Sequence, residues 1–178
     1  MVYLYSIIQK AISYQLIIIL EDIMEKLFYP ESIAIIGLSS RPNNIPRLVL
    51  ENLIRWGYMG RIFGINPNSS DLHVDDIKMY KEVGELPVVP DLVFILIPAR
   101  FVPNAIDSCG KVGIEGMVIP SDGFNELREE GNKLSDLILQ KAEQYCVWFA
   151  GPKSVSPHQG TGYQHGPGHY LRLRCCGP

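Results

Sequence analysis

The sequence has no excess of basic residues and no apolar run long enough to cross a bilayer. Its 16 Lys and Arg against 19 Asp and Glu leave a net charge of −3, which argues against a nucleic-acid-binding surface. The longest uninterrupted apolar run, residues 16–20, is far shorter than the roughly 20 residues that span a membrane. The first twenty residues also lack a basic start and a small-residue cleavage site, which argues against a signal peptide. We interpret residues 1–23 as an extension ahead of a start at Met24, with a membrane-associating amphipathic segment as the alternative.

The cysteines are not arranged for metal binding. The four are Cys109, Cys146, Cys175 and Cys176, and none forms a C-x-x-C pair or has partners at zinc-ligand spacing. Cys109 falls in a helical pattern and Cys146 just before an apolar run, so we expect both to be small buried hydrophobic residues. This usage favours a reducing, cytoplasmic compartment.

What the sequence does have is a regular alternation of short apolar runs and longer helical patterns. Its 178 residues, 47% hydrophobic and 20% charged, are typical of one compact globular domain. We expect strands at 32–36, 61–65, 92–97, 116–119 and 147–149, with a small edge strand around Met79. The run at 92–97 is apolar on both faces, as a central parallel strand must be. One helix between successive strands predicts an α/β fold with a doubly wound, mostly parallel, Rossmann-like sheet.

Loops at the carboxyl ends of such strands are where a doubly wound sheet binds ligands. In the first of them, Gly37 allows a tight turn, Ser39 and Ser40 can donate hydroxyl hydrogen bonds, and Arg41 supplies a positive charge for a phosphate. If Gly37 serves close approach to a phosphate, Gly37→Val should abolish binding in a domain that still folds. An ordinary strand-to-helix turn is the equal alternative, because one glycine is a weak signal.

A nicotinamide dinucleotide is disfavoured by the same loops. Its site would need a G-x-G-x-x-G turn and an acidic residue at the end of the second strand. Here Gly37 stands alone, and the second strand ends in Ile65-Asn66-Pro67-Asn68 without a carboxylate.

A series of short motifs between Met24 and Pro152 resembles the ADP-forming acetate–CoA ligases and the wider NDP-forming acyl-CoA synthetases. The motifs are LFYPESIAIIG at 27–37, SSRP at 39–42, INP at 65–67, IPAR at 97–100, SDGF at 121–124 and GP at 151–152. The resemblance implies that residues 24–152 form the domain that binds coenzyme A (CoA). Gly37, Ser39, Ser40 and Arg41 would then hold the phosphates and Asn66 and Pro67 face the adenosine end, with Pro98, Ala99 and Arg100 lining the nucleotide and Ser121, Gly123 and Phe124 lying toward the thiol.

Three positions depart from the family pattern. Pro46 stands where glycine is usual and removes one N–H that a phosphate could use, although proline suits the first turn of a helix. Asn68 stands where a Lys or Arg usually follows the Asn-Pro pair, and Lys153 replaces the asparagine after Gly-Pro.

The tail, residues 153–178, has no Asp or Glu and no apolar periodicity. We expect it to be disordered or the product of a shifted reading frame. A metal site built from His158, His165 and His169 with the two terminal cysteines is the disfavoured alternative.

The resemblance implies a chain that binds CoA or an acyl-CoA as the first domain of a truncated acyl-CoA synthetase, with the remaining ligase domains or subunit as candidate partners. The alternatives are a stand-alone CoA-binding module that serves a partner and, more distantly, an NAD(P)-binding oxidoreductase domain. We expect no catalytic residue and no metal. Because the phosphohistidine and ATP-grasp domains of that family are not recognisable, we expect no turnover by this chain alone.

Overall fold

One sheet of seven strands organises the chain, for which the computed structural model describes residues 21–69, 72–120 and 128–151. The strands are β1 (Ser32–Ile36), β2 (Arg61–Ile65), β3 (His73–Val74), β4 (Ile77–Tyr80), β5 (Leu92–Ile95), β6 (Gly116–Val118) and β7 (Trp148–Ala150). Their order across the sheet is β3-β4-β2-β1-β5-β6-β7. Neighbouring strands are parallel except β3 with β4. The expected doubly wound, mostly parallel sheet is therefore confirmed.

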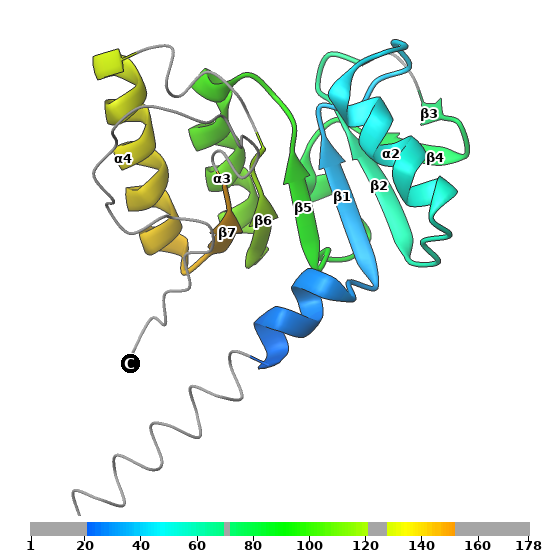
Figure 1. Cartoon of the computed structure of the whole chain (residues 1–178), viewed down its shortest axis with the longest axis horizontal. Helices are drawn as coiled ribbons and strands as arrows, with labels where there is room; N and C mark the ends of the chain where they lie inside the picture. The colour runs from blue at the N-terminus through cyan, green and yellow to red at the C-terminus, as the bar shows by residue number, and fades with distance from the viewer. Residues whose placement is uncertain (1–20, 70–71, 121–127, 152–178) are drawn as a thin grey trace, which may run out of the picture.

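Three α-helices and two short 3₁₀ turns connect the strands. They are α2 (Ile45–Arg55), η1 (Val83–Glu85), η2 (Ala99–Phe101), α3 (Val102–Lys111) and α4 (Arg128–Tyr145). In Figure 1, α2 lies beside β1, β2 and β4, while α3 and α4 lie beside β6 and β7. A further helical segment at residues 21–28 leads into β1. None of the described helices is long and apolar enough to cross a membrane.

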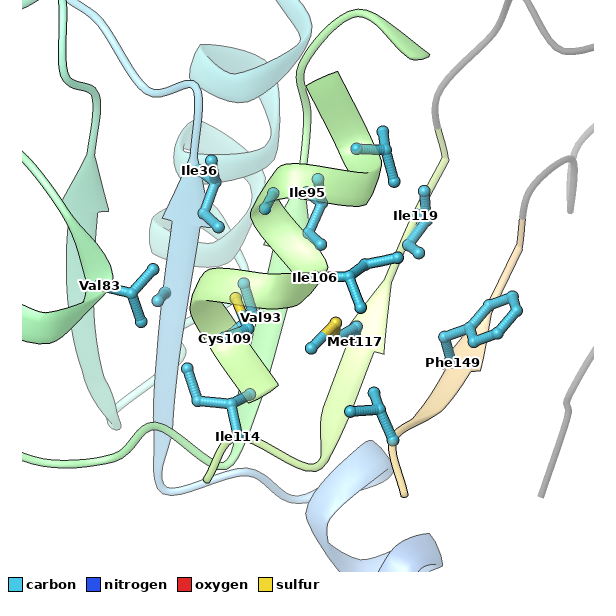
Figure 2. Close-up of a cluster of buried hydrophobic side chains, with 14 of the residues drawn as sticks. Ile36, Val83, Val93, Ile95, Ile106, Cys109, Ile114, Met117, Ile119 and Phe149 are labelled. Atoms are coloured by element: carbon cyan, nitrogen blue, oxygen red, sulfur yellow. The ribbon is translucent and has the colours of Figure 1, made fainter. Parts of the chain in front are cut away.

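Alternating side chains of the strands supply two separate cores, one on each face of the sheet. In β1, Ala34 and Ile36 belong to the cluster that includes α3 and α4, whereas Ile33 and Ile35 belong to the cluster that includes Leu50 of α2. Figure 2 shows the first cluster, with side chains from the strands meeting Ile106 and Cys109 of α3. Because the central strands are buried on both faces, their sequences read as continuous apolar runs.

Asp91, just before β5, fastens the start of β1 to its neighbour. One carboxylate oxygen, Oδ2, accepts hydrogen bonds from the backbone N–H of Glu31 at 3.0 Å and of Ser32 at 2.9 Å. The same oxygen accepts one from the Ser32 hydroxyl at 2.9 Å, and that hydroxyl oxygen lies 3.2 Å from the Asp91 backbone nitrogen. This cluster fixes the register at the amino ends of the two central strands.

Of the two cysteines expected to be buried, the structure confirms one. Cys109 is fully buried in α3, but Cys146 is exposed and has a left-handed φ of 55°. It follows directly after α4, where a residue in the left-handed conformation commonly ends a helix. The expectation for Cys146 was therefore wrong.

Candidate functional site

The chain direction reverses across the sheet between β1 and β5. From β1 the chain proceeds to β2 and then to β4 on one side, and it returns to β5 on the other side of β1 before continuing to β6 and β7. The loops that leave β1 and β5 therefore diverge, and ligands of open α/β sheets bind in the crevice that this creates.

A cleft of about 570 Å³ lies at this position. Its wall is contributed by the loops after four strands and by one side of α3: Gly37 after β1, Asn66, Pro67 and Asn68 after β2, Lys81 and Glu82 after β4, Ile97 and Pro98 after β5, and Phe101, Asn104, Ala105 and Ser108 from η2 and α3. The volume falls within the roughly 300–1,000 Å³ of small-molecule sites. The lining combines buried apolar side chains, such as Ile65 and Val83, with exposed polar ones, such as Lys81 and Asn104, which suits a ligand with both kinds of surface.

Gly37 is the residue of the first loop that reaches the cleft. Its N–H donates to the carbonyl oxygen of Ile65 at 2.8 Å, and its φ of +100° is one that side-chain-bearing residues rarely adopt. Ser39, Ser40 and Arg41 continue the loop but are not part of the cleft wall. Their assignment as phosphate ligands remains a prediction.

Asn44 closes that loop and begins α2. Its amide nitrogen donates to the carbonyl oxygen of Arg41 at 2.8 Å and to the hydroxyl oxygen of Ser39 at 3.1 Å, while its Oδ1 accepts from the N–H of Arg47 at 2.8 Å. Pro46 has no N–H. In the first turn of α2, the N–H of residue 46 is therefore absent and that of Arg47 is already bonded to Asn44. Fewer free N–H groups are left for a phosphate at this helix N-terminus.

Asn66 ties together the ends of three strands. Its backbone N–H donates to the carbonyl oxygen of Tyr80 at 3.0 Å, and its side-chain nitrogen donates to that of Leu38 at 2.9 Å. Its Oδ1 accepts from the N–H of Asn68 at 3.0 Å. The side chain thus holds the turns after β1 and β2 in fixed relation, and Pro67 lies in the cleft wall as a result.

After β5, the three predicted positions, Pro98, Ala99 and Arg100, differ in burial and in whether they line the cleft. Pro98 lines the cleft, whereas Ala99 is buried and is not part of the cleft wall. The guanidinium of Arg100 lies 4.6 Å from the ring centroid of Phe101, and Phe101 itself lines the cleft. Ser121, Gly123 and Phe124 lie outside the described residues.

Sequence reasoning missed the contribution of β4 and of α3. Lys81 and Glu82 follow β4 directly, and Asn104 and Ser108 lie four residues apart on one side of α3. Position directly after a strand was the available signal for Lys81, but β4 was recognised only as a small edge strand. Glu82 also brings a carboxylate to the cleft from β4, although none stands at the end of β2.

The part of the chain that the structure describes contains no group of three or more His, Cys, Asp or Glu that could hold a metal ion. Among the described residues, the polar side-chain groups that line the cleft are amides, a hydroxyl, one ammonium and one carboxylate. They can bind and orient a ligand through hydrogen bonds and charge.

A family model for the CoA-binding domain matches residues 31–155. The chain belongs to this family. The subunit alpha of acetate–CoA ligase [ADP-forming] I from Pyrococcus furiosus is 37% identical over 131 residues, which cover 72% of this chain and 28% of that protein. A trans-feruloyl-CoA synthase of an unknown prokaryotic organism is 33% identical over 132 residues, which cover 74% of this chain and 18% of that protein. The chain thus spans between about a fifth and about a quarter of the length of these relatives.

Solved structures with the same fold include one from an acetyl-CoA synthetase. The dinucleotide-forming acetyl-CoA synthetase 1 of Ca. Korarchaeum cryptofilum, solved with phosphate and ADP, superposes with a TM-score of 0.65 at 32% identity, over 72% of this chain and 27% of that one. A hypothetical protein of Pyrococcus horikoshii OT3 superposes with a TM-score of 0.50 at 22% identity, over 70% of this chain and 90% of that one. The second likeness shows the fold alone, and it shows that this fold can make up nearly all of a protein.

Proposed function

We propose that this chain binds CoA or an acyl-CoA in the cleft at the ends of β1, β2, β4 and β5, as the CoA-binding domain of an NDP-forming acyl-CoA synthetase of the acetate–CoA ligase type. The observation that carries the proposal is that the cleft of a chain in the CoA-binding domain family lies where a doubly wound sheet binds nucleotides. Gly37, Asn66, Pro67 and Pro98 are the residues predicted from the sequence that meet there.

The walls of the cleft match the two kinds of surface that CoA carries. Ile36, Ile65, Val83 and Ile97 offer apolar contacts for the adenine ring or the pantetheine arm. Polar rim groups offer hydrogen bonds to the ribose and phosphates. In this proposal the phosphoryl-transfer chemistry belongs to other ligase domains or subunits, and this chain contributes binding.

Isothermal titration with CoA, acetyl-CoA and NAD tests the proposal directly. We expect CoA and acetyl-CoA to bind and NAD to bind much more weakly, if at all. Affinity for NAD alone, or equal affinity for NAD and CoA, would overturn it.

A large side chain introduced into the cleft tests whether CoA binds there. Asn104 is an exposed residue of α3 that lines the cleft, so Asn104→Trp should block CoA binding without disturbing the core. Lys111 is exposed at the end of the same helix and is not part of the wall, so Lys111→Trp is the matched control. Unchanged affinity in Asn104→Trp, with both variants melting like the wild type, would move the site elsewhere.

A stand-alone CoA-binding module is the second candidate, since this fold can make up nearly all of a protein, as in the solved chain of which it covers 90%. The genomic neighbourhood distinguishes the two. A ligase component should be followed, in the same transcription unit, by coding sequence for the other ligase domains, whereas a module should have a different partner gene or none.

A further inference from the structure

Lys81 places a positive charge at the rim of the cleft, at the carboxyl end of β4. Its backbone N–H donates to the Glu85 carboxylate at 2.8 Å. Its ammonium nitrogen, Nζ, donates to the carbonyl oxygen of Ser69, in the loop that follows β2. An ammonium has three donors, so this bond positions the charge and leaves donors for a ligand. Among the described residues that line the cleft, Lys81 is the one cation.

The sheet order shows which part of a bound nucleotide this cation would meet. Strands run β4-β2-β1-β5 at the cleft, and neighbouring strands are about 4.8 Å apart. In doubly wound folds the pyrophosphate lies at the turn after the first strand, and the ribose of the adenosine lies over the end of the neighbouring second strand. Because β4 is one strand further in that direction, Lys81 lies about 10 Å from the end of β1, on the ribose side.

We propose that Lys81 binds the 3′-phosphate on the ribose of CoA and so makes this phosphate a determinant of specificity. The inference rests on the proposed function and adds a residue and a ligand group to it. A ribose phosphate is a compact dianion, and a lysine ammonium recognises such a group as a point charge. Neither NAD nor 3′-dephospho-CoA carries this phosphate.

Glu82 follows Lys81 and lines the same cleft. Its carboxylate only accepts hydrogen bonds, so it suits the free ribose hydroxyl next to the phosphate. Together the two side chains match a ribose that carries one phosphate and one hydroxyl.

Lys81 also has a structural role, because its bond to Ser69 holds the loop after β2. Loss of that role alone would lower the affinity for every ligand of the cleft by the same factor. The ratio of affinities for CoA and 3′-dephospho-CoA separates the two roles, since the ligands differ only in the ribose phosphate.

The test is a calorimetric titration of both ligands against the wild type, Lys81→Met, Lys81→Arg and Lys78→Met. Lys78 lies in β4 with its Nζ 5.1 Å from the ring centroid of Tyr80, outside the cleft wall, so Lys78→Met makes the same charge change nearby. We expect the wild type to prefer CoA about tenfold or more, as a charge-assisted contact allows. Lys81→Met should bring the ratio close to one, while Lys81→Arg and Lys78→Met keep most of the preference.

Two results would overturn the inference and leave CoA binding intact. One is equal affinity of the wild type for both ligands. The other is that Lys81→Met weakens the binding of CoA and of 3′-dephospho-CoA by the same factor. Lys81 would then act only by holding the loop at Ser69. If the wild type bound neither ligand, the proposed function itself would fail.

Discussion

Gly37 lies so close to the neighbouring loop that a Cβ placed on it would come within 2.5 Å of the carbonyl oxygen of Leu96. The backbone there is held from both sides, because Gly37 donates to Ile65 at 2.8 Å and Leu96 donates to Ile36 at 3.0 Å. The absence of a side chain at this position therefore serves the packing of β1 against the segment after β5.

This relationship changes the expectation for substitutions at Gly37. A valine there should destabilise the fold and not merely remove binding, contrary to what the sequence indicated. We expect Gly37→Ala to lower the free energy of unfolding by about 2–4 kcal/mol, from backbone strain and from the clash together. Gly113→Ala is the control, because Gly113 also has a positive φ, +83°, but nothing lies within 4 Å of its added Cβ. Equal losses in urea unfolding of the two variants would show that the contact with Leu96 matters little.

Asp91 should be among the most sensitive polar positions. Asp91→Ala leaves two backbone N–H groups and the Ser32 hydroxyl without their acceptor, so we expect a loss of about 2–4 kcal/mol. Asp76→Ala provides a comparison at an exposed position in the turn between β3 and β4 and should change stability by less than about 0.5 kcal/mol. Urea titrations of both variants measure the difference, and similar stabilities would remove the assigned role from Asp91.

The sequence was sufficient for the sheet because the central strands are buried on both faces. Residues 32–36 and 92–97 read as apolar runs, and the structure confirms a strand in each, although β5 (Leu92–Ile95) ends two residues earlier than expected. Strand β4 is different: Ile77–Tyr80 is partly exposed and pairs with β2 through only Met79 and Tyr80. Its weak pattern hid the fact that the residues after it reach the cleft.

The candidate site was predictable in its loops and not in its contacts. Position after a strand identified Gly37, Asn66 and Pro98 as residues of one edge. Which of them face the cleft depends on hydrogen bonds between loops far apart in the chain, such as that from Asn66 to Leu38. Residue types in one sequence do not encode these partners, because many asparagines near turns could make them.

Alkaline pH should destabilise the protein through two acids, the half-buried Tyr58 and the buried Cys109. Desolvation, followed by the nearby charge of Asp91, raises the pKa of Tyr58 from 10.0 to about 12. Burial raises the pKa of Cys109 from 9.0 to about 12. In both cases the folded state keeps the proton that the unfolded chain releases earlier, so stability present below about pH 9 is lost as pH rises toward 12.

Urea unfolding at a series of pH values between about 8 and 11 measures this loss. Tyr58→Phe removes one of the two acids, and its stability should fall less steeply than that of the wild type. Tyr29 is 80% exposed, so Tyr29→Phe should keep the wild-type slope. A Tyr58→Phe slope as steep as that of the wild type would assign the alkaline loss elsewhere.

Cys109 should resist alkylation in the native protein. With its pKa raised to about 12 by burial, roughly one molecule in ten thousand carries the reactive thiolate near pH 8, and the side chain is also inaccessible. Peptide mapping after iodoacetamide treatment should find Cys109 unmodified until guanidinium unfolds the chain. Labelling of the native protein at the rate of a free thiol would contradict the burial of α3 against the sheet.

Asn66 is expected to act on the ligand through the loops that it holds. Its side chain already donates to Leu38 and accepts from Asn68, so the two turns set its orientation before any ligand binds. Asn66→Ala should therefore lower the free energy of unfolding by about 1–3 kcal/mol and weaken CoA and 3′-dephospho-CoA by the same factor. Asn68→Ala is the comparison, since Asn68 takes part in that network through its backbone N–H, which alanine retains. Direct contact with the ligand predicts a different pattern: Asn66→Ala would reduce affinity while its unfolding curve stayed on that of the wild type. That pattern would return Asn66 to the role of a ligand-binding residue, because a clamp between two turns cannot be removed without a cost to the fold.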